Sequence, residues 1–248
     1  MDRPLATPAA TTGSRRHRRA WLWVTALTLG VATSAVLPLE IAEAQTTKTV
    51  VLMGDSLLNE GAPDITAALE KEGYSVDSSL AVNGAGILDT QIHWLAKARR
   101  LINDEDPSVV VVEYVGNYAV FGGVKGISVY SRPFYTLWGQ ASQRLENVLT
   151  ARGASVDWVI GPPVGLKVPE EGIKVFDRIY AHLHAPNTPS GRVPLIDVTP
   201  AVTDGTGHYT ASVSGPDGHM VQVRQSDGVH FTDYGASLFA NAIVSALP

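Results

Sequence analysis

The chain contains no cysteine among its 248 residues. This absence excludes disulfide bonds, a cysteine nucleophile, thiolate metal sites and the cysteine on which a bacterial lipid anchor is built. Charged residues are also scarce, at 17%, and the formal net charge is −5. Because lysine and arginine form no cluster in the body of the chain, we expect no nucleic-acid partner.

The first 44 residues have the composition of an export signal. Arginines at positions 15, 16, 18 and 19 precede an apolar stretch over residues 20–37, and Ala42-Glu43-Ala44 offers a small-x-small cleavage site. The stretch contains several threonines and stops at Pro38, which makes it marginal as a membrane span. We therefore predict a signal peptide over residues 1–44, used by the Sec or Tat route, and a secreted or extracytoplasmic protein. An uncleaved anchor that holds the protein at the envelope is the alternative.

Residues 45–248 alternate between strand-like and helix-like segments. Short apolar and β-branched runs predict strands, and helical spacing of apolar residues predicts helices between them. The predicted strands are 50–53, 75–82, 109–114, 156–160 and 193–198, and the predicted helices are 62–72, 87–103, 134–151, 175–184 and 231–247. A hairpin is expected over 207–224. This order predicts one α/β domain, a three-layer α/β/α sandwich of flavodoxin-like type around a mostly parallel sheet.

A serine and a histidine stand where such a sheet would bring them together. Ser56 follows the first strand directly, and Asp227 and His230 lie near the C-terminus. Open α/β sheets place their sites at the carboxyl ends of the strands. Serine attacks, histidine takes its proton and aspartate holds the imidazole in a serine hydrolase. Taken singly, each residue is also compatible with an ordinary turn.

The chain after about residue 46 resembles the SGNH (GDSL) hydrolase family in four blocks. The first is Gly-Asp-Ser-Leu at 54–57, and the second is Asn-Gly-Ala-Gly at 83–86. The third reads Val-Gly-Asn-Tyr at 115–118, and the fourth is Asp-x-x-His at 227–230. The third block departs from the family pattern, because Val115 replaces a glycine and Tyr118 replaces an aspartate.

The resemblance implies a role for each block. Ser56 would be the nucleophile, His230 the base and Asp227 its orienting carboxylate. The oxyanion hole would consist of the backbone N–H of Ser56, the backbone N–H of Gly86 and the side-chain amide of Asn117. Gly84 is the alternative to Gly86 at the second position. Asp55 is expected to be a structural carboxylate of the turn. The resemblance implies no metal and no cofactor.

The expected function is hydrolysis of carboxylic esters through an acyl-serine intermediate. The resemblance implies small-molecule, lipid or glycan acyl esters as substrates: acyl lipids, short-chain acyl esters or O-acetylated glycans. Two alternatives remain open at this point. One is an acyltransferase acting on an envelope sugar or lipid, and the other is a catalytically silent envelope-binding module. The glycine-rich loop over 119–132 either lines the mouth of the site or is a plain connection.

Overall fold

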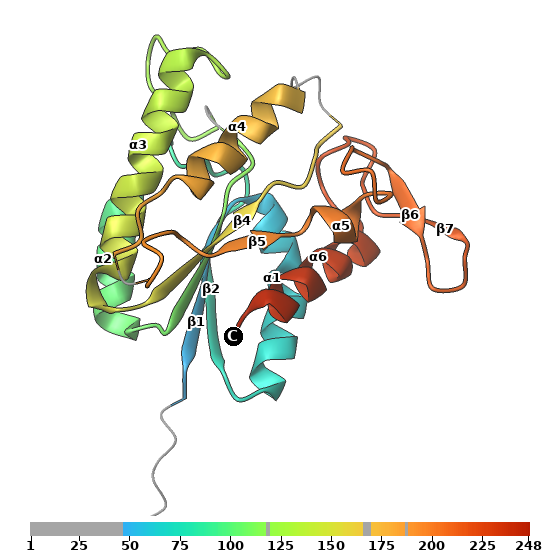
Figure 1. Ribbon diagram of the computed structural model, residues 1–248, viewed down its shortest axis with the longest axis horizontal. Coiled ribbons are helices and arrows are strands. Elements are labelled where there is room, and N and C mark those ends of the chain that lie inside the picture. Colours follow the sequence, from blue (N-terminus) through green and yellow to red (C-terminus); the bar gives the residue numbers. More distant parts are fainter. Residues whose placement is uncertain (1–46, 118–119, 166–169, 187) are drawn as a thin grey trace, which may run out of the picture. The chain divides into compact units, whose positions relative to one another are not determined.

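Five parallel strands in the order β2-β1-β3-β4-β5 form the central sheet of the computed structural model (Figure 1). The strands are β1 (Thr49–Gly54), β2 (Ser75–Ala81), β3 (Val109–Glu113), β4 (Ser155–Ile160) and β5 (Leu195–Asp197). The structure describes residues 47–117, 120–165, 170–186 and 188–248, so the export signal predicted for residues 1–44 lies outside the described residues. The predicted parallel sheet is confirmed.

Helices cover both faces of this sheet (Figure 1). One layer contains α1 (Ser56–Lys71), the short α5 (Thr199–Val202) and α6 (Asp233–Ala246), and the other contains α2 (Trp94–Glu105), α3 (Arg132–Leu149) and α4 (Glu170–Ala181). Side chains alternate along each strand. In β1, Val51 and Met53 join the core beneath α2 and α3, while Val50 and Leu52 join the core beneath α1 and α6. The three-layer architecture is therefore the one predicted.

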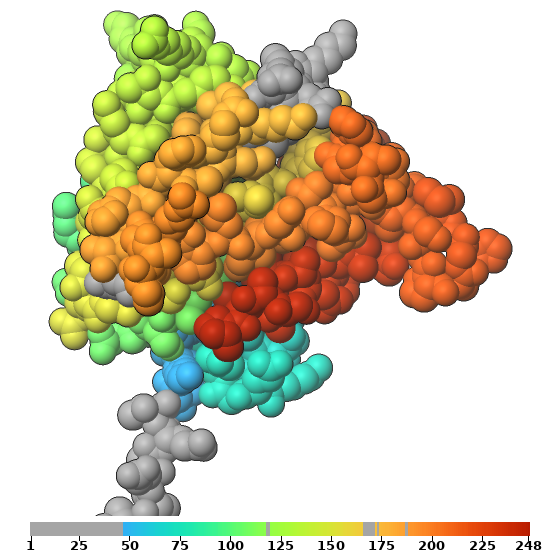
Figure 2. All heavy atoms as spheres, in the orientation of Figure 1, coloured from blue at the N-terminus to red at the C-terminus, as the bar shows by residue number. Residues whose placement is uncertain are grey.

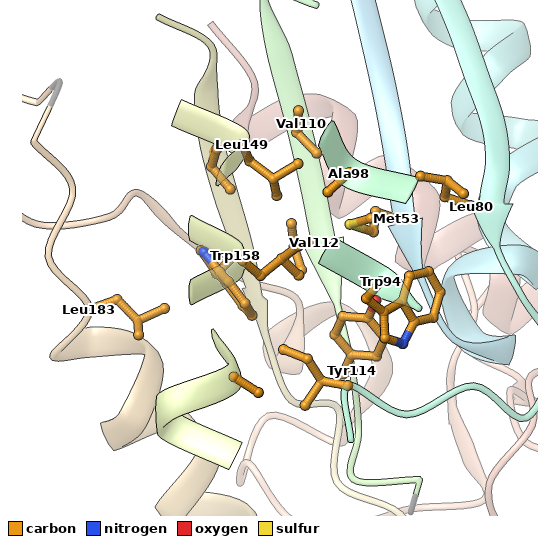
Figure 3. Close-up of a cluster of buried hydrophobic side chains, with 14 of the residues drawn as sticks. Met53, Leu80, Trp94, Ala98, Val110, Val112, Tyr114, Leu149, Trp158 and Leu183 are labelled. Atoms are coloured by element: carbon orange, nitrogen blue, oxygen red, sulfur yellow. The ribbon is translucent and has the colours of Figure 1, made fainter. Parts of the chain in front are cut away.

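Aromatic side chains fill the core between the sheet and the layer of α2, α3 and α4 (Figure 3). The rings of Trp94 and Tyr114 meet edge to face with centroids 5.5 Å apart. Trp138 donates its indole N–H to the hydroxyl of Tyr180 at 3.0 Å. An edge-to-face ring pair such as Trp94 and Tyr114 contributes about 0.5–1.5 kcal/mol beyond the free energy gained from the area that it buries. Trp94, Trp138 and Trp158 are all buried in this core.

Helix α1 begins at Ser56 and not at Ala62 as predicted. Asp55 caps it, because its Oδ1 accepts the backbone N–H of Leu57 at 3.0 Å. Pro63, expected near the helix start, lies inside the helix with an exposed ring. An interior proline costs about 3 kcal/mol in an exposed helix. Burial of Leu57 and other apolar residues of this helix offsets that cost.

Helix α2 begins at Trp94 and not at Ile87 as predicted. The preceding segment is a loop whose own polar contacts satisfy its backbone. The Asp89 carboxylate accepts the N–H of Gly86, and the Trp94 indole donates to the Gly86 carbonyl at 2.9 Å. Ile87 and Leu88 are buried from this loop. The apolar character of Ile87 and Leu88 therefore arises from their burial in a loop, and does not indicate a helix.

The remaining predicted elements are present with shifted ends. Helix α3 continues into a 3₁₀ turn, η1 (Thr150–Arg152), which ends at Gly153 with a φ of 96°. Helix α4 begins earlier than predicted and α6 begins two residues later, after the N-cap Thr232. The predicted hairpin is formed by the antiparallel strands β6 (Ser212–Ser214) and β7 (Met220–Gln222), which project at one edge of the molecular face in Figure 2. None of the helices in the described part of the chain is long and apolar enough to span a membrane.

Candidate active site

The ends of β1 and β3 lie side by side and open onto one site. The strand order is β2-β1-β3-β4-β5, so β2 lies on one side of β1 and β3 lies on the other. The boundary between β1 and β3 is therefore the switch point, where α/β sheets bind ligands. Ser56 follows β1, and Asn117 follows β3. Gly54 is needed here because a Cβ at this position would overlap the backbone carbonyl oxygen of Glu113. The strands can therefore approach closely just below the serine.

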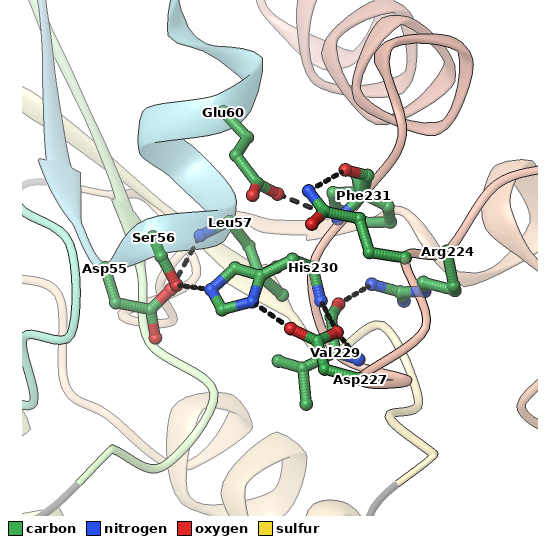
Figure 4. A network of polar contacts seen from close by, with 10 residues as sticks. Asp55, Ser56, Leu57, Glu60, Arg224, Asp227, Val229, His230 and Phe231 are labelled. Carbon is green, nitrogen blue, oxygen red and sulfur yellow. Dashed lines mark hydrogen bonds and ion pairs between the residues drawn. The ribbon is translucent and has the colours of Figure 1, made fainter.

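The structure joins Ser56, His230 and Asp227 in one row of hydrogen-bonding contacts, which we call the relay (Figure 4). The Nε2 atom of His230 lies 3.0 Å from the Oγ atom of Ser56. On the other side of the ring, Nδ1 lies 2.6 Å from Oδ2 of Asp227. The second carboxylate oxygen of Asp227 accepts the backbone N–H groups of Val229 and His230 at 2.9 and 3.0 Å. These are hydrogen-bonding distances for a nucleophile, a base and an orienting acid.

Asp227 is ionised in this arrangement. The hydrogen bond from His230 and then the backbone N–H of Val229 lower the pKa of Asp227 to about 2. An ionised Asp227 accepts a hydrogen from Nδ1 of His230, which leaves the lone pair of Nε2 directed at Ser56. The site can therefore move a proton from the serine hydroxyl to the imidazole and balance the charge that results.

Asp55 connects the serine to the third sequence block. It is fully buried, and its Oδ2 accepts both the backbone N–H of Val115 at 3.0 Å and the side-chain amide of Asn117 at 3.1 Å. Its other oxygen caps α1 at Leu57. Burial raises the pKa of Asp55, while these donors act in the opposite direction. Asp55 thus orients the Asn117 amide and holds the first turn of α1, on which Ser56 lies.

Two of the predicted oxyanion donors are the backbone N–H of Ser56 and the side-chain amide of Asn117. The backbone N–H of Ser56 belongs to the first turn of α1, the positive end of the helix dipole. The Asn117 amide donates one of its two hydrogens to Asp55, so the other can be donated to a substrate oxygen. Val115 supplies its backbone N–H to Asp55, a contact that requires no glycine at this position. Tyr118 lies outside the described residues.

Gly86 has a different arrangement from the one predicted. Its N–H donates to the carboxylate of Asp89, so it can serve an oxyanion only after that bond opens. A Cβ at Gly86 would overlap the backbone carbonyl oxygen of Asn117. The glycine therefore gives the second block room to pack on the third. The alternative, Gly84, has a φ of 71° and packs beside Val120 of the glycine-rich loop.

Two residues that the sequence analysis missed fix the turn that carries His230 (Figure 4). Glu60 accepts the backbone N–H of Phe231 at 2.8 Å. It lies one helical turn after Ser56 on α1, and this i, i+4 spacing was the available signal. Arg224 donates to the carbonyl oxygen of Val229 at 2.6 Å and to that of Pro163 at 3.0 Å. Nothing in the sequence distinguished this arginine from a surface cation.

The described residues contain no group of three histidine, cysteine, aspartate or glutamate side chains that could hold a metal ion. His182, one of a closely spaced histidine pair, directs Nδ1 at the carbonyl oxygen of Arg178 at 2.6 Å. In the glycine-rich loop, the carbonyl groups of Phe121 and Gly122 accept the backbone N–H groups of Gln91 and Thr90. This loop therefore packs against the segment that follows the second block.

Comparison with known proteins places this architecture in a family. A family model described as "Protein of unknown function (DUF459)" matches residues 49–246. The chain belongs to the DUF459 family. No curated protein matches this DUF459 chain. Its fold is that of the SGNH (GDSL) hydrolases, as the resemblance implied.

Three solved structures illustrate the shared fold. A GDSL-like lipase from Bacteroides thetaiotaomicron is 17% identical with a TM-score of 0.55, over 80% of this DUF459 chain and 87% of the lipase. A psychrotrophic esterase from Pseudoalteromonas sp. is 13% identical with a TM-score of 0.54, over 80% and 96% of the two chains. A carbohydrate esterase of family 3 from Talaromyces cellulolyticus is 14% identical with a TM-score of 0.53, over 80% and 95%.

Proposed function

We propose that this DUF459 protein is a serine hydrolase that cleaves carboxylic esters through an acyl-serine intermediate. The observation that carries the proposal is the relay from Asp227 through His230 to Ser56, with heavy-atom distances of 2.6 and 3.0 Å. The lowered pKa of Asp227 keeps its carboxylate ionised, as an orienting acid requires.

The reaction follows from these positions. Oγ of Ser56 attacks the ester carbonyl carbon while Nε2 of His230 takes the hydroxyl proton. The resulting tetrahedral oxyanion accepts hydrogen bonds from the Ser56 N–H and the Asn117 amide. When the intermediate collapses, the bond to the alcohol oxygen breaks, and His230 returns the proton to that oxygen. The alcohol leaves, and the acyl group stays on Ser56 as an ester.

Water completes the cycle by the same steps. His230 accepts a proton from the water, the water oxygen attacks the acyl-serine carbonyl, and Ser56 leaves as the restored hydroxyl. Each preorganised oxyanion donor is worth about 2.7–4 kcal/mol of barrier. The His230 side chain is 37% exposed, so water reaches the base directly.

The substrate class follows from the fold relatives and the leader. The names of the similar structures include a lipase, an esterase and a carbohydrate esterase. Acyl lipids, short-chain acyl esters and O-acetylated glycans are therefore the proposed substrates. The basic and apolar N-terminal segment supports export, so we propose that these esters are met outside the cytoplasm, at or beyond the envelope.

The test is turnover of p-nitrophenyl esters from acetate to palmitate by the wild-type protein and by Ser56→Ala. We expect serine-dependent hydrolysis, with a chain-length profile that separates short-chain from lipid esters. Labelling by a fluorophosphonate probe should occur in the wild type and be absent in Ser56→Ala. A folded protein that neither hydrolyses these esters nor reacts with the probe would contradict the proposal and favour a silent binding module.

An acyltransferase would share every residue of this relay. The two activities differ in the acceptor, so the product partition with an added alcohol distinguishes them. For a hydrolase, we expect free acid as the main product even when the alcohol is abundant.

A further inference from the structure

Two carboxyl groups are buried together beneath the nucleophile. Glu113 is the last residue of β3 and pairs in register with Gly54, and the backbone N–H of Asp55 donates to the Glu113 carbonyl oxygen at 3.2 Å. The exposed fractions of Asp55 and Glu113 are 0% and 1%. Both carboxyl groups are thus buried at the adjoining ends of β1 and β3, and each shifts the pKa of the other. The reaction described above uses no atom of Glu113.

Asp55 has the surroundings of a carboxylate. Three N–H donors converge on it, from Leu57, Val115 and the Asn117 side chain, at 3.0, 3.0 and 3.1 Å. A carboxylate that accepts several N–H bonds is favoured over its acid form. Ionised, Asp55 can accept all three donors and one more.

Glu113 has the opposite surroundings. Within the described part of the chain, neither of its carboxyl oxygens has a hydrogen-bond partner of ordinary geometry. The backbone N–H groups of Leu58 and Asp55 lower the pKa of Glu113, but burial raises it more. A buried carboxylate without such partners costs several kcal/mol. As a neutral acid, however, Glu113 carries a hydrogen that it can donate to Asp55. Burial first, and then the negative charge of Asp55, hold the pKa of Glu113 well above its ordinary value.

The other titratable groups around the pair leave this assignment unchanged. Tyr114 and Tyr180 are neutral, because burial raises the pKa of each. The nearest buried cation, Arg224, directs its guanidinium hydrogens at the carbonyl oxygens of Val229 and Pro163. The described structure contains no ion pair that would hold Glu113 as an anion.

We propose that Glu113 is a positioning residue for the ester hydrolysis: as a neutral acid it donates a hydrogen bond to the Asp55 carboxylate and so fixes the Asn117 amide. The proposal rests on the proposed function for its catalytic consequence. The chain of contacts runs from Glu113 to Asp55 and from Asp55 to both Asn117 and the first turn of α1. If Glu113 lost its proton, two negative charges would lie next to each other in the protein interior, away from water.

The first test compares Glu113→Gln with Glu113→Leu in the full chain. Glutamine keeps a neutral hydrogen-bond donor, whereas leucine keeps the volume and removes the donor. We expect Glu113→Gln to retain kcat within about threefold, and Glu113→Leu to lower kcat by about tenfold or more with KM within about threefold. If Glu113 only stabilised the fold, glutamine would not selectively restore kcat. KM would also not stay constant in both variants.

Two outcomes would overturn the proposal. If Glu113→Gln folds normally and loses as much kcat as Glu113→Leu, a neutral donor is not what the site requires. If Glu113→Leu retains full kcat, the hydrogen bond has no effect on the amide. Should Glu113→Leu fail to fold, the glutamine variant and the measurement below decide the question.

The second test reads the proton itself and needs no activity. The infrared carbonyl band of protonated carboxyl groups is recorded for the full chain at neutral pH, as a difference between wild type and Glu113→Gln. We expect one protonated carboxyl to disappear, and the control Glu72→Gln, at the exposed C-cap of α1, to remove none. Absence of any difference would contradict the neutral acid even if esterase activity is found. If the difference appears without esterase activity, the proton assignment holds and the proposed function fails.

Discussion

The guanidinium carbon of Arg224 lies 3.9 Å from the centroid of the Phe231 ring. Arg224 is 1% exposed, and the stack joins the strand end after β7 to the residue that follows His230. A cation over a desolvated aromatic face contributes about 2 kcal/mol or more. The same guanidinium donates to the carbonyl oxygen of Val229, so one side chain fixes both neighbours of the histidine. The position of His230 therefore depends on a residue whose own contacts are with Val229, Phe231 and Pro163.

Arg224→Lys should impair the site although it preserves the charge. Lysine has no planar fork that can reach two carbonyl groups and stack on a ring at the same time. We expect kcat to fall about tenfold and the melting temperature to fall by several degrees, as for the loss of a buried polar network. Thermal unfolding and p-nitrophenyl ester kinetics measure both. The control is Arg152→Lys, whose exposed pair with Asp106 should contribute little. Equal effects in the two variants would contradict the role of Arg224.

Gly86→Ala should separate the second and third blocks. The added methyl group would overlap the backbone carbonyl oxygen of Asn117, which cannot move without displacing the amide. We expect a loss of stability of about 1–3 kcal/mol and a larger proportional loss in kcat than in KM. Gly139→Ala on helix α3 is the matched control, because among the described residues its methyl group would meet only Ile179 of α4, at 3.6 Å. An alanine at position 86 that leaves kcat unchanged would show that the Asn117 amide is not an oxyanion donor.

Asp227→Asn should leave the fold intact and slow the chemistry. The amide can accept from Nδ1 but brings no negative charge to balance the imidazolium, and it can also favour the wrong tautomer. We expect kcat to fall about a thousandfold or more, with little change in KM. Because the pKa of Asp227 is lowered to about 2, its charge should not limit activity at any pH above about 4. An effect confined to KM would remove Asp227 from the relay.

Glu146 should make the stability of the fold depend on pH. This residue of α3 is fully buried and accepts the indole N–H of Trp158 at 2.9 Å, and burial raises its pKa from 4.5 to about 7. At a pH between 4.5 and about 7, Glu146 has lost its proton in the unfolded chain but keeps it in the folded protein. The free energy of unfolding therefore falls as the pH rises. The loss should reach roughly 3 kcal/mol above pH 7.

Denaturant unfolding between about pH 5 and pH 8 tests this dependence. Glu146→Gln keeps an acceptor for Trp158 and removes the titration, so its stability should vary less with pH than that of the wild type. Glu72→Gln, at an exposed position, should leave the wild-type dependence unchanged. A wild-type protein that is equally stable across this range would show that Glu146 does not retain its proton.

The sequence predicted the layers of the fold well because they follow from periodicity. Strand β3 reads as four valines and a glutamate, and such a run has few alternatives to a strand buried on both faces. The start of α1 was predicted poorly, since Pro63 is a strong local signal and the burial of Leu57 and Leu58 is a tertiary effect. Local rules had no access to that packing.

The site shows the same division. Ser56, Asp227 and His230 occupy motifs that resemble SGNH blocks, a resemblance that predicted their meeting, and the structure places them in hydrogen-bonding contact. The engagement of Gly86 by Asp89 depends on a loop where a helix was predicted. Arg224 and Glu113 gave no sequence signal, because a buried charge or acid is recognised only by the groups that surround it. The chemistry was therefore predictable, and its supporting contacts were not.

The relay joins residues separated by 174 positions along the chain. Contacts of such separation are costly in loop-closure entropy and tend to form late in folding. During synthesis, Ser56 therefore makes its contact with His230 only after residue 230 has emerged from the ribosome. If the proposed function holds, intermediates that have built only β1, β2 and β3 would be inactive, and ester hydrolysis regained in a refolding experiment would count only molecules in which the segment with His230 has docked.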